Sequence, residues 1–211
     1  IGSGAGSAVM TTDANGTVAV GAVALNKLTS GQYNTAVGYY AMEDETLGDE
    51  STAVGYQALL NQAGTDGEVQ NTAVGAKAGA GLTTGTHSTV VGAYALYTNT
   101  TGKQNTVIGL KAMNSNTTGC DNIAIGFCAL VANTTGIYNT AIGSCALRAT
   151  TTAQHNTAVG MMSLGSNTTG NQNTAYGQQS LYANTTGCLN VAVGVGALLC
   201  NTTGKYNIAI G

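Results

Sequence analysis

The stretch NTAVGYYAM, residues 34–42, recurs along the chain in close copies. Examples are STAVGYQAL at 51–59, NTAVGAKAG at 71–79 and NTAIGSCAL at 139–147. The glycine that closes each T-A-V motif returns every 17 residues, except for one step of 20 residues between Gly55 and Gly75. A fixed period is typical of solenoid proteins, so we expect one repeat domain over 1–211. Its first coil, 2–20, is degenerate, and a three-residue insertion lies within 56–74.

The repeating unit reads G-x-x-A-L-x-x-N-T-T-G-x-x-N-T-A-V. N-T-T-G and the closing glycine are turn signals, because Gly and Asn tolerate a positive φ. Between them lie two short segments, T-A-V and x-A-L, which we interpret as strands, and no glycine-free stretch is long enough for a helix. The prediction is an all-β fold, a parallel β-solenoid (β-roll or β-helix) of about twelve 17-residue coils.

Stacked coils place equivalent residues above one another in columns. The fifth column predicts a buried aliphatic core: Leu25, Leu59, Leu96, Leu130, Leu147, Leu164, Leu181 and Leu198, with Met at 42 and 113 and Gly at 79. The column before the closing glycine is also apolar and is expected to face inward: Val37, Val54, Ile108, Ile125 and Ile142 are examples. Alternation along the strand then points the central alanine outward.

This alanine column has two interpretations, which the sequence leaves equally open. Small residues suit a crowded pleat, or they form a close packing face against another chain. The column comprises Ala36, Ala53, Ala73, Ala124, Ala141, Ala158, Ala175, Ala192 and Ala209.

An asparagine column precedes each strand, with Ser at 51 and 88. It comprises Asn34, Asn71, Asn105, Asn122, Asn139, Asn156, Asn173, Asn190 and Asn207. Stacked amides can hydrogen-bond from coil to coil as a ladder, which accounts for these residues without a ligand.

The composition offers little for catalysis or for charged partners. Charged residues make up only 7% of the chain and the net charge is −3, so nothing attracts nucleic acid. Seven of the nine acids lie between 43 and 68, and we interpret them as a solvated patch rather than a cation site. His87 and His155 are four coils apart, too far to share a metal, and no Ser or Thr has a neighbouring base. We therefore expect no enzyme activity, no catalytic or metal site and no cofactor.

The longest apolar run, VAVGVGALLC at 191–200, is too short to span a bilayer, so no membrane insertion is expected. The five cysteines do not form a disulfide framework. Cys128 and Cys145 share a column in adjacent coils, within disulfide range, although a stack of small apolar side chains is the simpler interpretation.

The motif N-T-A-[VI]-G resembles the repeats of trimeric autotransporter adhesin heads. The longer string NTTGxxNTAVGxxAL resembles repeats of bacteriophage tail-fibre and related virion appendage proteins. This resemblance covers nearly the whole chain and implies association of three chains, here through the alanine column. The coils of the adhesins are shorter than 17 residues.

The leading hypothesis is a rigid extracellular shaft or a fibre or filament segment of an adhesin, a phage tail fibre or a self-assembling surface filament. It would lie on a cell or virion surface, with copies of itself as partners and a host-surface glycan or protein as a further candidate. Homotrimer and head-to-tail filament stay open: the resemblance implies a trimer, whereas Ile1-Gly2 and Ile210-Gly211 share one phase of the repeat, which suits end-to-end assembly. The alternative is an ice-binding solenoid that uses the paired threonines of N-T-T-G. A glycan-binding or glycan-cleaving β-helix is more remote, because cleavage needs clustered carboxylates.

Overall fold

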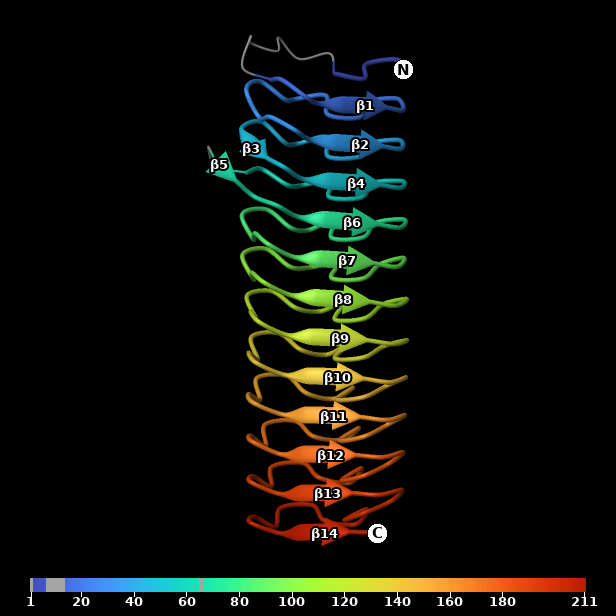
Figure 1. Cartoon of the computed structure of the whole chain (residues 1–211), viewed down its shortest axis with the longest axis vertical. Coiled ribbons are helices and arrows are strands. Elements are labelled where there is room, and N and C mark those ends of the chain that lie inside the picture. The colour runs from blue at the N-terminus through green and yellow to red at the C-terminus, as the bar shows by residue number, and fades with distance from the viewer. Residues whose placement is uncertain (1, 7–13, 65–66) are drawn as a thin grey trace.

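A computed structural model describes residues 2–6, 14–64 and 67–211. Twelve strands of this part of the chain form one parallel sheet, in the order β1-β2-β4-β6-β7-β8-β9-β10-β11-β12-β13-β14. They are β1 (Val18–Val20), β2 (Thr35–Val37), β4 (Thr52–Val54), β6 (Thr72–Val74), β7 (Thr89–Val91), β8 (Thr106–Ile108), β9 (Ile123–Ile125), β10 (Thr140–Ile142), β11 (Thr157–Val159), β12 (Thr174–Tyr176), β13 (Val191–Val193) and β14 (Ile208–Ile210). Figure 1 shows these strands stacked in one column, with loops on both sides. The fold is the predicted all-β parallel β-solenoid.

Equivalent residues pair at every step of the sheet. Thr140 pairs with Thr157 and Ala141 with Ala158, and the same register holds between the other neighbouring strands. Strands β3 (Gly48–Asp49) and β5 (Gly67–Glu68) form a separate pair beside the column (Figure 1). The insertion lies here, because contacting residues are 17 apart at Glu45 and Gln62 but 20 apart at Ser51 and Asn71.

The predicted second strand, x-A-L, is wrong. This segment is a run of turns in which alternate residues have positive φ, for example Tyr40 at 56° and Met42 at 49°. Such a conformation costs a non-glycine residue roughly 1–2 kcal/mol. Hydrogen bonds between coils hold it: the Met42 N–H donates to the Ala58 carbonyl oxygen at 3.0 Å, and the Tyr40 N–H to that of Ala22 at 3.1 Å. Each coil therefore contains one short strand of the main sheet and one hydrogen-bonded turn segment.

The leucine column forms the core. Leu25, Leu59, Leu96, Leu130, Leu147, Leu164 and Leu181 are fully buried, and Leu198 is partly buried against them. At Gly79, where the column lacks a side chain, an added Cβ would lie 3.0 Å from Leu59 Cδ2. The methyl group of Leu59 therefore occupies part of the space that a leucine at 79 would take.

The strand residues face opposite to the prediction. Ala36, Ala53, Ala73, Ala124, Ala141, Ala158, Ala175 and Ala192 are fully buried, and Ala209 is half-buried. Val54, Ile108 and Ile142 are 37–38% exposed, and Val37 and Ile125 are half-buried on the same outer side. The alanine column is therefore part of the core and not a surface for packing another chain.

The physical reason is the narrow interior of the coil. The strand alanines share the core with the leucine column and with a second alanine column, which includes Ala41, Ala129 and Ala146. Small side chains on the strand leave room for the leucines that reach in from the turn segment. The β-branched residues then occupy the outer face, where a pleated strand accommodates them well.

Candidate functional site

The outer side of the main sheet is a regular surface of the described chain, and we call it the Thr–Val face. Its first column is Val18, Thr35, Thr52, Thr72, Thr89, Thr106, Ile123, Thr140, Thr157, Thr174, Val191 and Ile208. Its second column is Val20, Val37, Val54, Val74, Val91, Ile108, Ile125, Ile142, Val159, Tyr176, Val193 and Ile210. Neighbouring strands lie about 4.8 Å apart, so methyl and hydroxyl groups repeat at that spacing along the rod. The face contains no charged side chain.

Two groups of threonines differ in what their hydroxyls do. In the N-T-T-G turns the first threonine donates to the next coil, as Thr117 Oγ1 does to the Thr134 carbonyl oxygen at 3.1 Å and Thr168 Oγ1 to that of Thr185 at 3.1 Å. The strand threonines of the Thr–Val face, such as Thr140 and Thr157, donate no side-chain hydrogen bond to the described residues. Their hydroxyls are available to water or to a partner.

The predicted asparagine column forms a hydrogen-bonded ladder. Asn139 Nδ2 donates to Asn122 Oδ1 at 3.2 Å, and each further step from Asn105 to Asn207 repeats this contact. Where serine interrupts the column, the backbone continues it, since the Ser51 N–H donates to Asn34 Oδ1 at 2.9 Å. Asn71 receives the Ser88 N–H at 2.9 Å in the same way. These residues, all buried except the partly buried Asn207, hold adjacent coils together.

A second ladder runs through the asparagine of N-T-T-G, a residue whose sequence context predicted only a turn. Asn133 Nδ2 donates to Asn116 Oδ1 at 2.8 Å, and Asn184 Nδ2 to Asn167 Oδ1 at 2.9 Å. The column breaks at Thr150, and Asn133 Oδ1 there is a buried acceptor without a hydrogen-bond partner. The recurrence of asparagine at this position in most coils was the feature of the sequence that could have predicted this ladder.

Restoring this ladder is expected to stabilise the rod, but only through two coupled changes. In the other coils, a Cβ on the glycine of N-T-T-G would overlap the side-chain oxygen of the asparagine, and the Thr150 coil has Ala153 at that place. Thr150→Asn with Ala153→Gly should satisfy Asn133 Oδ1 and raise the free energy of unfolding by about 1 kcal/mol. Thr150→Asn alone should lower it, since Ala153 crowds the new amide.

Urea denaturation of the parent, both single variants and the double variant gives the four free energies of unfolding of a double-mutant cycle. The expected coupling is favourable. If the two changes combine additively, the proposed clash at Ala153 is wrong.

Glu45 is a fully buried carboxylate in the same column as this second ladder, from which Leu82 separates it, and this corrects its placement in a solvated acidic patch. Its Oε1 accepts the backbone N–H groups of Thr46 at 2.8 Å and Gly48 at 2.8 Å. The next coil contributes the Gly64 N–H at 3.1 Å and, to Oε2, the Gln62 amide at 2.7 Å. No cationic side chain is within ion-pair distance of it among the described residues. Glu45 therefore fastens the loop around β3 to the insertion.

Removing this carboxylate should destabilise the chain near the insertion. Glu45→Ala leaves several buried donors without an acceptor, and we expect a loss of about 3 kcal/mol in the free energy of unfolding. Glu43→Ala, a neighbouring half-buried carboxylate, should change it by less than about 0.5 kcal/mol. Equal losses in chemical denaturation of the two variants would contradict the role assigned to Glu45.

The cysteines and histidines do not assemble a reactive site. Cys128 and Cys145 are free thiols, so the disulfide considered for this pair is absent. Burial raises the pKa of the Cys128 thiol, and the neighbouring Cys145 adds to the shift, which disfavours the reactive thiolate. His87 and His155 are both exposed, and the His155 ring stacks on Tyr138 with centroids 5.0 Å apart.

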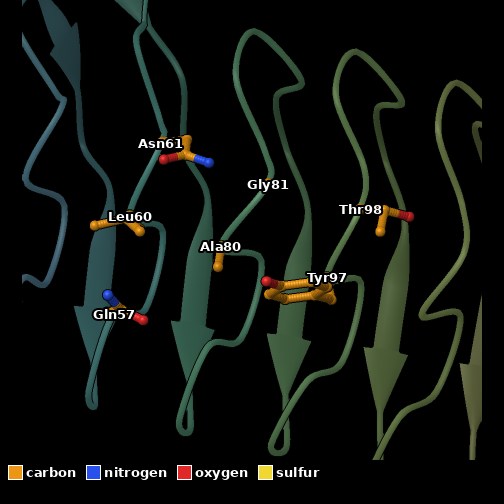
Figure 2. Close-up of a pocket in the computed structure, with 7 residues that line it drawn as sticks. All are labelled: Gln57, Leu60, Asn61, Ala80, Gly81, Tyr97 and Thr98. Atoms are coloured by element: carbon orange, nitrogen blue, oxygen red, sulfur yellow. The ribbon is translucent and has the colours of Figure 1, made fainter.

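A shallow cavity of about 230 Å³ interrupts the side of the rod, and we call it the Tyr97 cavity. It is lined by Gln57, Leu60 and Asn61 of one coil, Ala80 and Gly81 of the next, and Tyr97 and Thr98 of the third. Figure 2 shows Ala80 between Leu60 on one side and the Tyr97 ring on the other. None of these side chains is charged.

Within the described ranges, no cluster of three or more His, Cys, Asp or Glu side chains could hold a metal ion. The same part of the chain contains no helix that could cross a membrane. No protein-family model, curated protein or solved structure matches this chain. The fold thus defines a class, the tandem-repeat parallel β-solenoids.

Proposed function

We propose that this chain is a non-enzymatic structural protein, a rigid shaft or fibre segment on the surface of a cell or virion. The observation that supports this most is the unbroken register of the twelve-stranded sheet together with two internal amide ladders. Bending the rod would disturb backbone and side-chain hydrogen bonds in every coil at once. A solenoid of this kind gains its stability from neighbouring coils and suits a spacer of fixed length.

Rigidity can be measured with pairs of spin labels. In a background with the five native cysteines replaced by alanine, one label is placed at Thr52→Cys and the second at Thr140→Cys or Val191→Cys. The labelled strands are five and eight steps apart, so the two distances should differ by about 14 Å. Pulsed electron–electron double resonance should give two narrow distance distributions whose means differ by this amount. Broad distributions would contradict a rigid shaft.

The proposed partners are further copies of the chain, which associate through the Thr–Val face rather than the alanine column. Eleven steps of about 4.8 Å and a three-residue width give roughly 500 Å² on each copy, or about 1,000 Å² in total. This is the lower limit for a specific interface. Exposed apolar residues beside the face, such as Tyr39, Phe127 and Met161, would extend it.

Sedimentation velocity tests this association. Ile142→Glu places a charge on the face and should shift the parent oligomer toward monomer, whereas Thr135→Glu in an exposed turn should not. Association through this face would be contradicted if the parent stays monomeric at high concentration, or if the Ile142→Glu variant forms the same oligomer as the parent.

A second candidate function is ice binding, favoured by the outward direction of the strand threonines. Of the paired turn threonines that the sequence suggested for this role, the first of each pair donates to a backbone carbonyl oxygen, as at Thr117 and Thr168. The strand threonines instead lie two residues from an outward Val or Ile and repeat along a regular sheet, with free hydroxyls beside methyl groups. Such an array can order surface water over several coils.

Thermal hysteresis at micromolar protein is the test. Under this candidate the parent depresses the freezing point below the melting point, Thr157→Tyr abolishes the gap and Thr118→Tyr, in an exposed turn, preserves it. Absence of hysteresis in the parent would remove this candidate and leave the shaft proposal unaffected.

A further inference from the structure

The Tyr97 cavity originates in a run of small residues. The segment AKAGAGL, 76–82, contains only one long side chain before Leu82. Preceding and following coils place Leu60-Asn61 and Tyr97-Thr98 at the positions of Ala80-Gly81. The wall of the rod therefore has a methyl group and a bare glycine where the neighbouring coils have longer side chains.

The backbone at Gly81 is already in close contact with the next coil, so it cannot move to fill the Tyr97 cavity. A Cβ at this position would overlap the Tyr97 carbonyl oxygen and lie 3.2 Å from Thr98 Cα. The Gly81 N–H donates to the same carbonyl oxygen at 2.8 Å. The two coils are thus held in contact at the floor of the cavity, which gives it a fixed shape.

One wall is a pre-positioned aromatic ring. The Tyr97 ring extends toward the coil of Ala80 (Figure 2), and it packs at a tilt against Tyr94 with centroids 5.5 Å apart. Lys77 Nζ lies 5.4 Å from the centroid of the Tyr94 ring and thereby supports it. Tyr97 is half-buried, so it presents a flat apolar surface at low entropic cost.

Polar groups at the opposite rim are unused. The side-chain amides of Gln57 and Asn61 make no hydrogen bond to the described part of the chain. Each amide offers a carbonyl acceptor and an NH₂ donor, a pair that matches adjacent hydroxyl groups. Leu60 provides an apolar contact between them.

We propose that the Tyr97 cavity binds one neutral sugar ring, as part of a glycan. The C–H face of a pyranose would lie on Tyr97, and its hydroxyls would bond the amides of Gln57 and Asn61. The volume is smaller than the roughly 300–1,000 Å³ of drug-sized sites, which fits a single ring. The uncharged lining excludes selection for acidic sugars. This site goes beyond the proposed shaft role, since a shaft needs no ligand.

Saturation-transfer NMR with the methyl glycosides of glucose, galactose, mannose and N-acetylglucosamine tests the site. At least one should bind with a Kd on the order of 1–10 mM, as expected for so few atoms. Sodium glucuronate, the charged control, should bind more weakly. No saturation transfer to any of the four glycosides would overturn the proposal, and the shaft would stand or fall separately on its rigidity.

Two variants locate the binding. Ala80→Leu fills the gap and should reduce affinity at least tenfold while the fold persists, because Leu60 and Leu199 occupy the same column. Tyr97→Ala removes the platform and should have the same effect on binding.

Tyr182→Ala is the matched control. Tyr182 occupies the equivalent position in another coil, where its ring lies on the backbone of Gly165, 3.1 Å from a Cβ built there. It should bind as the parent does. Binding that survives Ala80→Leu and Tyr97→Ala, or is lost in Tyr182→Ala alone, would overturn the assignment.

Discussion

Replacing Ala141 by Glu should unfold the middle of the rod, whereas Ile142→Glu should be tolerated. Ala141 is fully buried and Ile142 is 38% exposed, although both are apolar neighbours on β10. Glu at 141 places an unpaired charge and a larger side chain in the narrow core, at a cost of at least about 4 kcal/mol. Glu at 142 points toward solvent and should cost about 1 kcal/mol or less.

Urea denaturation monitored by circular dichroism gives both values at equilibrium. The parent provides the reference slope, which should not change for Ile142→Glu. Similar losses in the two variants would mean that the strand does not alternate between core and solvent as described.

A second large effect is expected at the closing glycines. Gly126 has φ +133°, a conformation that other residues rarely adopt, and an added Cβ would lie 2.6 Å from the Gly143 carbonyl oxygen. Gly126→Ala should therefore lower the free energy of unfolding by about 3 kcal/mol or more, from backbone strain and from overlap with the next coil.

Gly67→Ala separates these two causes. Gly67 has φ +114°, but a Cβ there would meet no atom of the described residues within 4 Å, so we attribute its effect to the strain. Its loss should be smaller than that of Gly126→Ala in the same thermal and chemical melts. Equal losses would show that close stacking at the closing glycine contributes nothing.

The period of the sequence predicted the architecture because parallel stacking requires equivalent residues to recur at one spacing. It therefore located the leucine column and the asparagine column, whose members, such as Asn139, hydrogen-bond to the equivalent residue of the neighbouring coil. Residue type alone was sufficient for these two columns: long aliphatic side chains are buried, and amides of equal length can bond to their copies.

Residue type could not decide which side chains of the strand face the core. Both Ala141 and Ile142 are apolar, and a three-residue strand satisfies alternation in either phase. The decision depends on the space inside the coil, which the leucines already fill. The nearly uniform alanine column was a signal of that limit, since a surface would tolerate larger residues.

The turn segment and the cavity depend on contacts between coils. Leucine rarely adopts a positive φ, so nothing local predicts Leu130 at 51°; the hydrogen bond from its N–H to the Ala146 carbonyl oxygen holds it there. The sequence likewise does not distinguish Glu45 from the neighbouring surface acids, because its burial depends on the fold of its own loop and on the next coil. The run AKAGAGL was visible in the sequence, but its meaning came only from Leu60 and Tyr97 on either side.

Thiol labelling measures most directly which strand positions face the core and which face solvent, and it introduces no charge into the core. In a background lacking the native cysteines, Ala141→Cys and Ile142→Cys are compared for their rate of reaction with a maleimide under native conditions. The account predicts rapid labelling at 142 and labelling at 141 that is at least a hundredfold slower, limited by unfolding. Rapid labelling at 141 with protection at 142 would contradict it, and with it the Thr–Val face on which association and ice binding are proposed.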